Sequence, residues 1–216
     1  MQTTPPTPPT GQPRLRDDDG RLLRGERSRG RIRAAAQELF RERGFDGATL
    51  RAIAERAGMG ASSIYRHVRS KEELLVWELS DLQDEAWTRF RREDDRKRPT
   101  RERVLRFAEH QFELLASRSD FTTIALRALT FPEERVARQV LQLHDRTIGL
   151  LAEILMTGRK QNDLAQGLDV LAAARVLFFA TLGPRTDWAN GQLDEAGCRR
   201  AVARAVELVF DGIGPR

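Results

Sequence analysis

Four side chains that can donate or accept hydrogen bonds lie within five residues of one another: Ser62, Ser63, Tyr65 and Arg66. On a helix that turns about 100° per residue, Ser62 and Arg66 lie on the side opposite the apolar Ile64, so this polar side faces outward. Hydroxyl groups and a guanidinium reach base edges and phosphates when a short helix enters a major groove. The stretch therefore predicts a DNA-reading helix, with a solvated helix pair as the alternative.

A preceding helix must hold this stretch in place. Thr49 can cap its first turn, because a threonine hydroxyl accepts a hydrogen bond from a free backbone N–H group. Gly58 is suited to end it, because glycine adopts a positive φ at little cost. The apolar residues at helical spacing between them are Leu50, Ile53, Ala54 and Ala57. We therefore predict a helix-turn-helix over residues 49–68, with Ile64 and Val68 on the inner side of its second helix.

The chain before the helix-turn-helix divides into three parts. Residues 1–20 are rich in proline and have few apolar side chains, so we expect a disordered tail. Residues 21–33 are dense in arginine and form either a flexible arm that lies in a DNA groove or a solvated linker. A first helix should then end at Arg43, where Gly44 is the stop signal. Its buried side is marked by Ile32, Ala36, Leu39 and Phe40.

The positive charge is concentrated on this part of the chain. Residues 21–69 contain twelve arginines and five acidic residues, which is a net charge of +7. The whole chain of 216 residues has a net charge of only +5, so the remainder is close to neutral. A basic segment beside a nearly neutral remainder is typical of a domain that neutralises phosphates.

The sequence predicts helices up to its C-terminal end. Ser70 and Glu73 fit a capping box, which opens a long connector helix. Beyond Pro99 there is no alternation typical of strands, and Pro184 should kink or end the helix that contains it. The expected helices after Pro99 cover residues 101–117, 123–129, 132–158, 169–184 and 194–213. The fold class is therefore predicted to be all-α, with about nine helices.

Enzyme and membrane-protein signatures are missing from the sequence. Metalloprotease, hydrolase and phosphate-loop motifs do not occur, and His67, His110 and His144 are too scattered to form a site by spacing. The one cysteine, Cys198, provides neither a disulfide nor a zinc cluster within a chain, and we interpret it as a small buried residue. No apolar run approaches membrane-spanning length and no secretory signal is recognisable. We expect a cytoplasmic protein with no enzymatic activity, metal, cofactor or membrane contact.

Residues 24–75 resemble the DNA-binding domain of the TetR family of transcriptional regulators. The matching residues are Gly44, Phe45, Thr49, Ile53, Ala54, Ala57, Gly58, Ile64, Tyr65, His67, Lys71 and Leu74. Three positions depart from the family pattern, namely Gly60, Ser62 and Val68. The resemblance covers about a quarter of the chain, and the later helices agree with the family in number, length and order.

The resemblance implies a homodimeric repressor in a bacterial cell, nucleoid-associated when bound, that a small apolar ligand releases from a palindromic operator in double-stranded DNA. It implies a DNA-binding domain over residues 24–70, joined by the connector helix to a helical effector-binding and dimerisation domain over residues 71–216. The implied phosphate contacts are Thr49, Tyr65, His67 and Lys71. The residues nearest the bases are then Arg51, Ser62, Ser63 and Arg66. A DNA-binding architectural or regulatory protein without an effector is the alternative, although two-thirds of the chain would then have no clear use.

The apolar residues of the second domain supply candidates for a ligand pocket and for a dimer interface. The pocket candidates, for which plain core packing is the alternative, are Trp77, Trp87, Phe107, Phe112, Phe121, Phe131 and Phe178. The interface candidates, on stripes that could instead pack within their own subunit, are Val170, Ala174, Leu177, Phe178, Thr181, Val202, Val206, Val209 and Ile213. Two such helices from each subunit would form a four-helix bundle about a two-fold axis.

The +7 segment predicts a steep salt dependence of DNA binding. If the protein neutralises about six phosphates, its affinity for duplex DNA should fall roughly 10³-fold between 50 and 200 mM salt, because bound counterions are released on binding. Fluorescence anisotropy of a labelled duplex at several salt concentrations measures this slope. A flat dependence would contradict phosphate binding by the basic segment.

Overall fold

The computed structural model describes residues 17–130 and 132–213. Over these residues it contains helices and no strands, which confirms the predicted all-α class. The nine helices are α1 (Asp17–Gly47), α2 (Leu50–Arg56), α3 (Ala61–Ile64), α4 (Lys71–Glu93), α5 (Thr100–Ser117), α6 (Ser119–Thr130), α7 (Glu134–Lys160), α8 (Val170–Ala189) and α9 (Glu195–Ile213).

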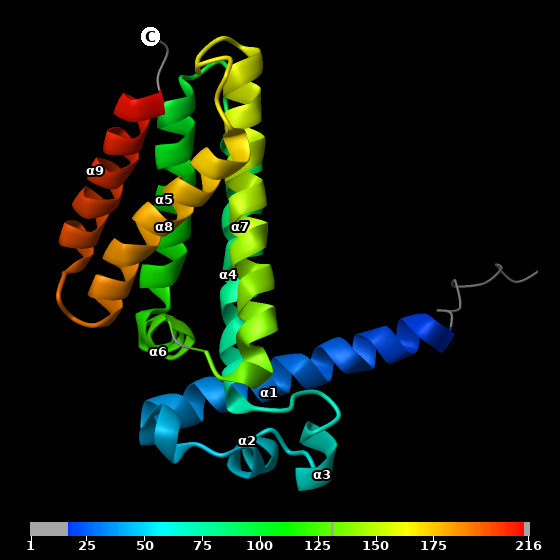
Figure 1. Ribbon diagram of the computed structural model, residues 1–216. Coiled ribbons are helices and arrows are strands. Elements are labelled where there is room, and N and C mark those ends of the chain that lie inside the picture. The colour runs from blue at the N-terminus through cyan, green and yellow to red at the C-terminus, as the bar shows by residue number, and fades with distance from the viewer. Residues whose placement is uncertain (1–16, 131, 214–216) are drawn as a thin grey trace, which may run out of the picture.

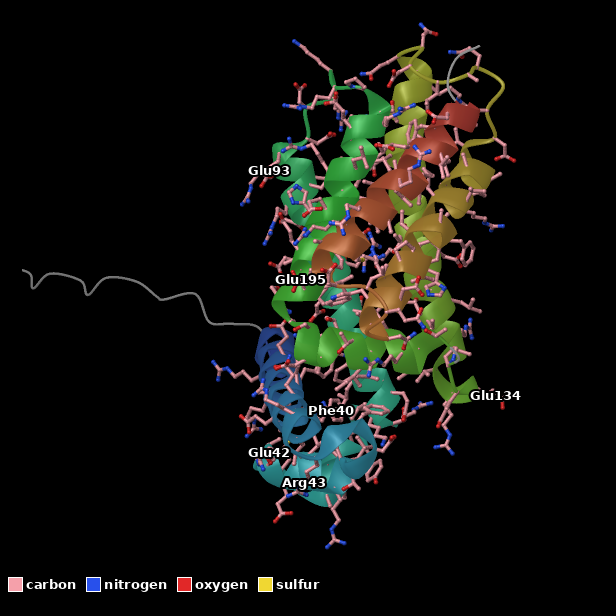
Figure 2. All side chains as sticks on the ribbon, turned by 90° about the vertical axis from the view of Figure 1, so that its left-hand side faces the viewer. Phe40, Glu42, Arg43, Glu93, Glu134 and Glu195 are labelled. Carbon is pink, nitrogen blue, oxygen red and sulfur yellow. The ribbon has the colours of Figure 1, made fainter. Side chains whose placement is uncertain are left out.

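The helices form a small head and a longer body (Figure 1). The head is α1 to α3, at one end of the molecule. The body contains α4, α5 and α7, which run along its length, while α8 packs against both α7 and α9. Helix α6 lies across the junction between head and body (Figure 1). Because α4 has 23 residues, it spans about 35 Å and connects the head with the far part of the body.

Helix α1 begins earlier than expected. Residues 1–16 of the predicted tail lie outside the described residues, whereas residues 17–20 already belong to the helix. Residues 21–33 are also helical, so the prediction of a flexible arm or linker was wrong. Arginine and leucine favour helix, and extending a helix that is already anchored needs no new nucleus. The regular helix is interrupted at Gly44, where φ is 70°, as the sequence predicted.

The helix-turn-helix forms where it was predicted. Thr49 caps α2, since its Oγ1 accepts a hydrogen bond from the backbone N–H of Ala52 (3.2 Å), and Gly58 turns the chain with φ 65°. Helix α3 is only four residues long, but the turn that follows keeps a helical hydrogen bond from the Val68 N–H to the Ile64 carbonyl (3.0 Å). Ile64 and Val68 are both buried.

Helix α4 begins with half of the predicted capping box. The Ser70 Oγ accepts from the Glu73 backbone N–H at 3.3 Å, which is the first half. The Glu73 carboxylate accepts instead from the Arg69 N–H at 2.8 Å, one residue before the expected donor. Both bonds satisfy N–H groups at the start of the helix and fix the direction in which α4 leaves the head.

Two of the later helices differ from the prediction. Helix α6 starts at Ser119, four residues early, with Asp120 in its first turn. Helix α8 does not end at Pro184 but continues to Ala189. Proline removes a single backbone donor, and the buried Trp188 and Ala189 of the last turn are held by tertiary packing.

The apolar core of the head extends into the body. We call this cluster the head core; it contains Ile32, Leu39, Phe40, Ile53, Ile64, Val68 and Leu75, together with Phe121, Ala125, Leu129, Val136 and Val140 from α6 and α7. The rings of Phe40 and Phe121 lie 5.5 Å apart between centroids. The head core therefore continues across the predicted domain boundary at residue 70.

A buried carboxylate lies at the same junction. Glu78 of α4 has no exposed surface, and its Oε1 accepts a hydrogen bond from Arg118 Nη1 at 2.7 Å. Its Oε2 lies 3.5 Å from Nε of Arg33 in α1. One charge in α4 thus contacts the head and the body together.

Candidate nucleic-acid interface and ligand cavity

The predicted recognition residues lie at the end of the molecule that is farthest from α9 (Figure 1). Tyr65 is 58% exposed although it follows the fully buried Ile64. Ser62 and Arg66 are exposed as well, and Ser63 is partly buried. The polar side of α3 therefore faces outward, as its helical spacing predicted.

Arg66 and Ser63 are linked to each other. The Arg66 Nη2 donates a hydrogen bond to the Ser63 Oγ at 3.1 Å, which holds the guanidinium against the start of α3. The remaining guanidinium donors stay available for base edges or phosphates.

Helix α2 is fixed against α1 by a second arginine. Arg56 donates from Nη1 to Glu38 (3.0 Å) and from Nη2 to Glu42 (2.8 Å). The hydrogen bond from Arg56 lowers the pKa of the Glu42 carboxyl. The positive charge of this arginine offsets part of the negative charge of the two acids, which weakens their repulsion of phosphates near Thr49 and Arg51, exposed at the start of α2.

Lys71 has a structural role in addition to its predicted phosphate contact. Its Nζ donates to the Phe45 carbonyl oxygen at 2.8 Å and lies 4.3 Å from the centre of the Phe45 ring. The side chain is only 22% exposed. Lys71 therefore holds the first residues of α4 against the last turn of α1, beyond the interruption at Gly44, and contact with a phosphate would use its remaining N–H groups.

Two arginines that we did not predict from the sequence lie beside the recognition residues. Arg69, from the turn before α4, and Arg135, from the first turn of α7, line one open hollow together with Tyr65, Arg66 and His67. Among the residues lining this hollow, Glu73 is the acidic one. Arg135 lies far from this segment in sequence, so only the packing of α7 against the head could reveal it.

A cavity of about 90 Å³ lies in the body, where α4 to α8 meet. Its apolar lining residues are Leu79, Leu82, Leu115, Leu126, Leu143, Phe178 and Leu182. Its polar lining residues are Gln83, Gln111, His144, Thr147 and Arg185. A concave, mostly apolar site with a few polar groups is the usual form of a small-molecule site.

Most of the aromatic residues predicted for the pocket pack elsewhere. Only Phe178 lines the cavity. Phe131 lies outside the described residues. The others fill core clusters: Trp77 and Phe121 contact the head core, Trp87 and Phe107 pack with Phe90, and Phe112 packs on Trp188. The cavity differs from the predicted pocket because large rings most effectively fill space between helices, whereas leucines surround the space that stays open.

The polar residues that line the cavity differ in their hydrogen bonding and in the effect of burial on their pKa. Gln83 Nε2 donates to the Leu143 carbonyl (3.3 Å) and to Thr147 Oγ1. Burial lowers the pKa of His144, whose ring lies 4.9 Å from that of Phe178. Burial also lowers the pKa of Arg185, to about 10. Arg185 follows Phe178 and Thr181 at helical spacing, but the sequence prediction missed it because the expected helix stopped at Pro184.

The residues predicted for the dimer interface mostly face their own subunit. Buried residues in this set are Val170, Ala174, Leu177, Phe178, Thr181, Val202 and Val206; Val209 is partly buried, and the Ile213 side chain is not described. These buried residues are not available to a partner. Four other apolar residues are between 51% and 59% exposed, namely Leu171, Val176, Phe179 and Leu208. Periodicity located both helices but could not distinguish which apolar side faces outward.

The remaining residue types give no sign of a second chemistry. In the part of the chain that the structure describes, no three or more histidines, cysteines, aspartates or glutamates are grouped so as to bind a metal ion. Across residues 17–130 and 132–213, none of the helices combines the length and apolar character of a membrane span. Cys198 is fully buried, and burial raises the pKa of its thiol to about 11.

The fold and the exposed recognition residues define a helix-turn-helix DNA-binding protein with a helical second domain. Residues 32–76 match the family described as bacterial regulatory proteins, tetR family. Over these residues the chain has the DNA-binding domain of the TetR family of transcriptional regulators, and regulators of that family bind DNA and act as dimers.

The similarity to known proteins extends beyond the head. It is 23% identical over 180 residues to the fatty acid metabolism regulator protein of Bacillus subtilis, covering 83% of this chain and 92% of that protein. It is 23% identical over 195 residues to the regulator UidR of Escherichia coli K12, covering 90% and 97%. The structure of Thermus thermophilus FadR, a TetR-family repressor in complex with lauroyl-CoA, is similar with a TM-score of 0.74, 25% identity and coverage of 87% and 96%.

The geometry of α3 predicts separate effects for Arg66 and its neighbours. Arg66→Ala should weaken discrimination at one or two base pairs by about 1–3 kcal/mol, because the guanidinium is exposed on the outward side of α3. Tyr65→Phe should weaken binding to all sequences alike, because a phosphate contact has no sequence information. Competition assays with single-base variants of a selected operator would measure both.

Arg138→Ala, an exposed arginine on α7, is the control for a general loss of charge. An unchanged base preference in the Arg66 variant would show that other residues read the bases.

Proposed function

We propose that this protein is a homodimeric repressor that leaves a palindromic operator when an apolar ligand widens the cavity of its body. The observation that supports the proposal is the position of the cavity relative to the head core. Three helices that line the cavity also contribute to that core. They are α4, α6 and α7.

Helix α6 contacts both the head core and the cavity within five residues. Ala125 and Leu129 belong to the head core, while Leu126 lines the cavity. A ligand that displaces Leu126 therefore moves the residues that support Phe40. The coupling needs no intermediary element.

Helix α7 makes the same connection over a single turn. Val136 and Val140 pack in the head core, and Leu143 lines the cavity one turn later. The Gln139 Nε2 also donates to Glu73 Oε1 at 3.3 Å, close to the recognition residues. Movement of α7 would reach the DNA-binding face through Val140 and through this hydrogen bond.

The small size of the cavity is suited to such a switch. Pockets for drug-sized ligands have volumes of about 300–1,000 Å³, so a cavity of about 90 Å³ must widen to accept such a ligand. The ligand would then favour a conformation that differs from the one with a packed head core. Such differential affinity is what shifts a conformational equilibrium.

A fatty-acyl chain is the ligand class that we propose. The cavity is lined mainly by leucines, and the similar Thermus thermophilus FadR is in complex with lauroyl-CoA. The chain would displace apolar contacts between α4, α6, α7 and α8. Since the regulator acts on operator DNA, we propose that it works in the cytoplasm.

A dimer is needed because one short recognition helix reads too few base pairs to select an operator. We propose that the subunits meet through the exposed apolar residues of α8 and α9, which are Leu171, Val176, Phe179 and Leu208. Isolated exposed leucines are common, but several exposed apolar residues on two helices that pack against each other are typical of an interface.

The effector model predicts that a filled cavity abolishes the ligand response. Wild-type protein should release a duplex operator, selected from a random pool, on addition of sodium laurate or lauroyl-CoA. Leu143→Trp should still bind the operator but no longer respond, because the indole occupies the cavity. Leu141→Trp, on the same helix but 61% exposed in wild type, is the matched control. Fluorescence anisotropy reports both binding and release.

Two outcomes would count against the effector model. Release that persists in Leu143→Trp would place the effector elsewhere. An operator that no acyl compound releases would favour the alternative of a regulator without an acyl effector.

The interface proposal predicts that Phe179→Asp dissociates the dimer and abolishes operator binding. The helical signal in circular dichroism should be retained, because Phe179 is 59% exposed within its subunit. Leu141→Asp places the same charge at an equally exposed leucine outside α8 and α9. Sedimentation velocity distinguishes the two. A Phe179→Asp protein that remains dimeric would place the interface on another surface.

A further inference from the structure

Arg185 is an unusual residue in the wall of the cavity. It is only 5% exposed, and the rest of its helix is largely apolar. Burial of a guanidinium is costly unless an anion neutralises it. The residue remains a cation at neutral pH, since the pKa lowered by burial is still about 10.

The partners of Arg185 within the protein are neutral. Its Nη2 donates to Gln111 Oε1 at 3.1 Å and to the Ala108 carbonyl at 3.4 Å. Nε is buried and has no hydrogen-bond partner among the described residues. Within residues 17–130 and 132–213, no carboxylate forms an ion pair with this guanidinium.

The groups that face Arg185 across the cavity do not supply the missing charge. Gln83 and Thr147 are neutral, and desolvation favours the neutral form of His144. Every other lining residue is a leucine, a phenylalanine or Gln111. The cavity therefore has a single fixed cation among apolar and neutral polar side chains.

We propose that Arg185 is the anion-binding residue of this cavity and that the ligand is an apolar molecule with a free carboxylate, such as a fatty acid. The inference rests on the proposed effector function and names the chemistry of its ligand. A carboxylate can accept two hydrogen bonds from the edge of a guanidinium, and such charge-assisted bonds are the strongest that a polar group forms in an apolar site.

A thioester does not offer the same match. Its carbonyl oxygen is neutral, so the positive charge of Arg185 would remain uncompensated, and the large coenzyme A group would have to lie outside a cavity of about 90 Å³. A fatty acid and an acyl-CoA provide the same acyl chain, and binding measurements with ligands of equal chain length distinguish the two.

The test is calorimetric titration of the full-length protein with sodium octanoate, 1-octanol and octanoyl-CoA. Wild-type protein should bind octanoate at least about tenfold more tightly than octanol, which corresponds to one charge-assisted pair. Arg185→Gln should reduce this ratio to about one while octanol binding is kept. Arg138→Gln, which removes an exposed charge from the cavity-lining helix α7, should leave the ratio unchanged.

A thermal melt and a second variant control for misfolding of Arg185→Gln. We expect Arg185→Gln to melt at or above the wild-type temperature, because it removes an uncompensated buried charge. If it does not fold, Arg185→Lys serves instead; it retains the charge but loses the two-donor edge, and it should show an intermediate octanoate preference.

The outcomes separate this inference from the proposed function. Equal binding of octanoate and octanol by wild type, an octanoate preference that survives in Arg185→Gln, or no binding of octanoate would each overturn the role of Arg185. If octanoyl-CoA alone binds and releases DNA, the effector function stands without the carboxylate. If octanoate binds through Arg185 but leaves operator binding unchanged, the site stands and effector-driven release does not.

Discussion

The packing of the head against the body is the constraint on which the rest of the structure depends. The helix-turn-helix is too small to bury its apolar residues alone, because α2 has seven residues and α3 has four. Its core is completed by Phe121, Ala125 and Leu129 of α6 and by Val136 and Val140 of α7. The orientation of the recognition residues is therefore set by helices that belong to the body.

This dependence gives the cavity its influence over DNA binding. Leu126 and Leu143 line the cavity, and their neighbours in α6 and α7 support the head. The buried Glu78 adds a polar contact across the same junction, through Arg33 on one side and Arg118 on the other. Close-packed interfaces of this kind have a few discrete arrangements rather than a continuous range, which suits a switch between two states.

Charge is divided between two uses. The +7 segment provides long-range attraction to phosphates, and its arginines are mostly exposed, where water screens them. Arg185 is the opposite case, a single buried cation in the wall of a cavity lined mainly by leucines, where screening by water is weak. The exposed set is suited to a polyanion that binds at the surface, and the buried residue is suited to one small anion.

The sequence by itself determined the features that depend on neighbours within a few residues. Thr49 and Ser70 cap helices, Gly44 and Gly58 end them, and apolar spacing locates the buried sides, so the fold class and the outward side of α3 were predictable. Only the tertiary structure decided which partner each apolar side meets. Val206 and Phe179 are both apolar residues within predicted helices, yet Val206 is buried and Phe179 is 59% exposed. The sequence of a helix shows which of its sides are apolar, but the burial of each side depends on helices that lie far away in the chain.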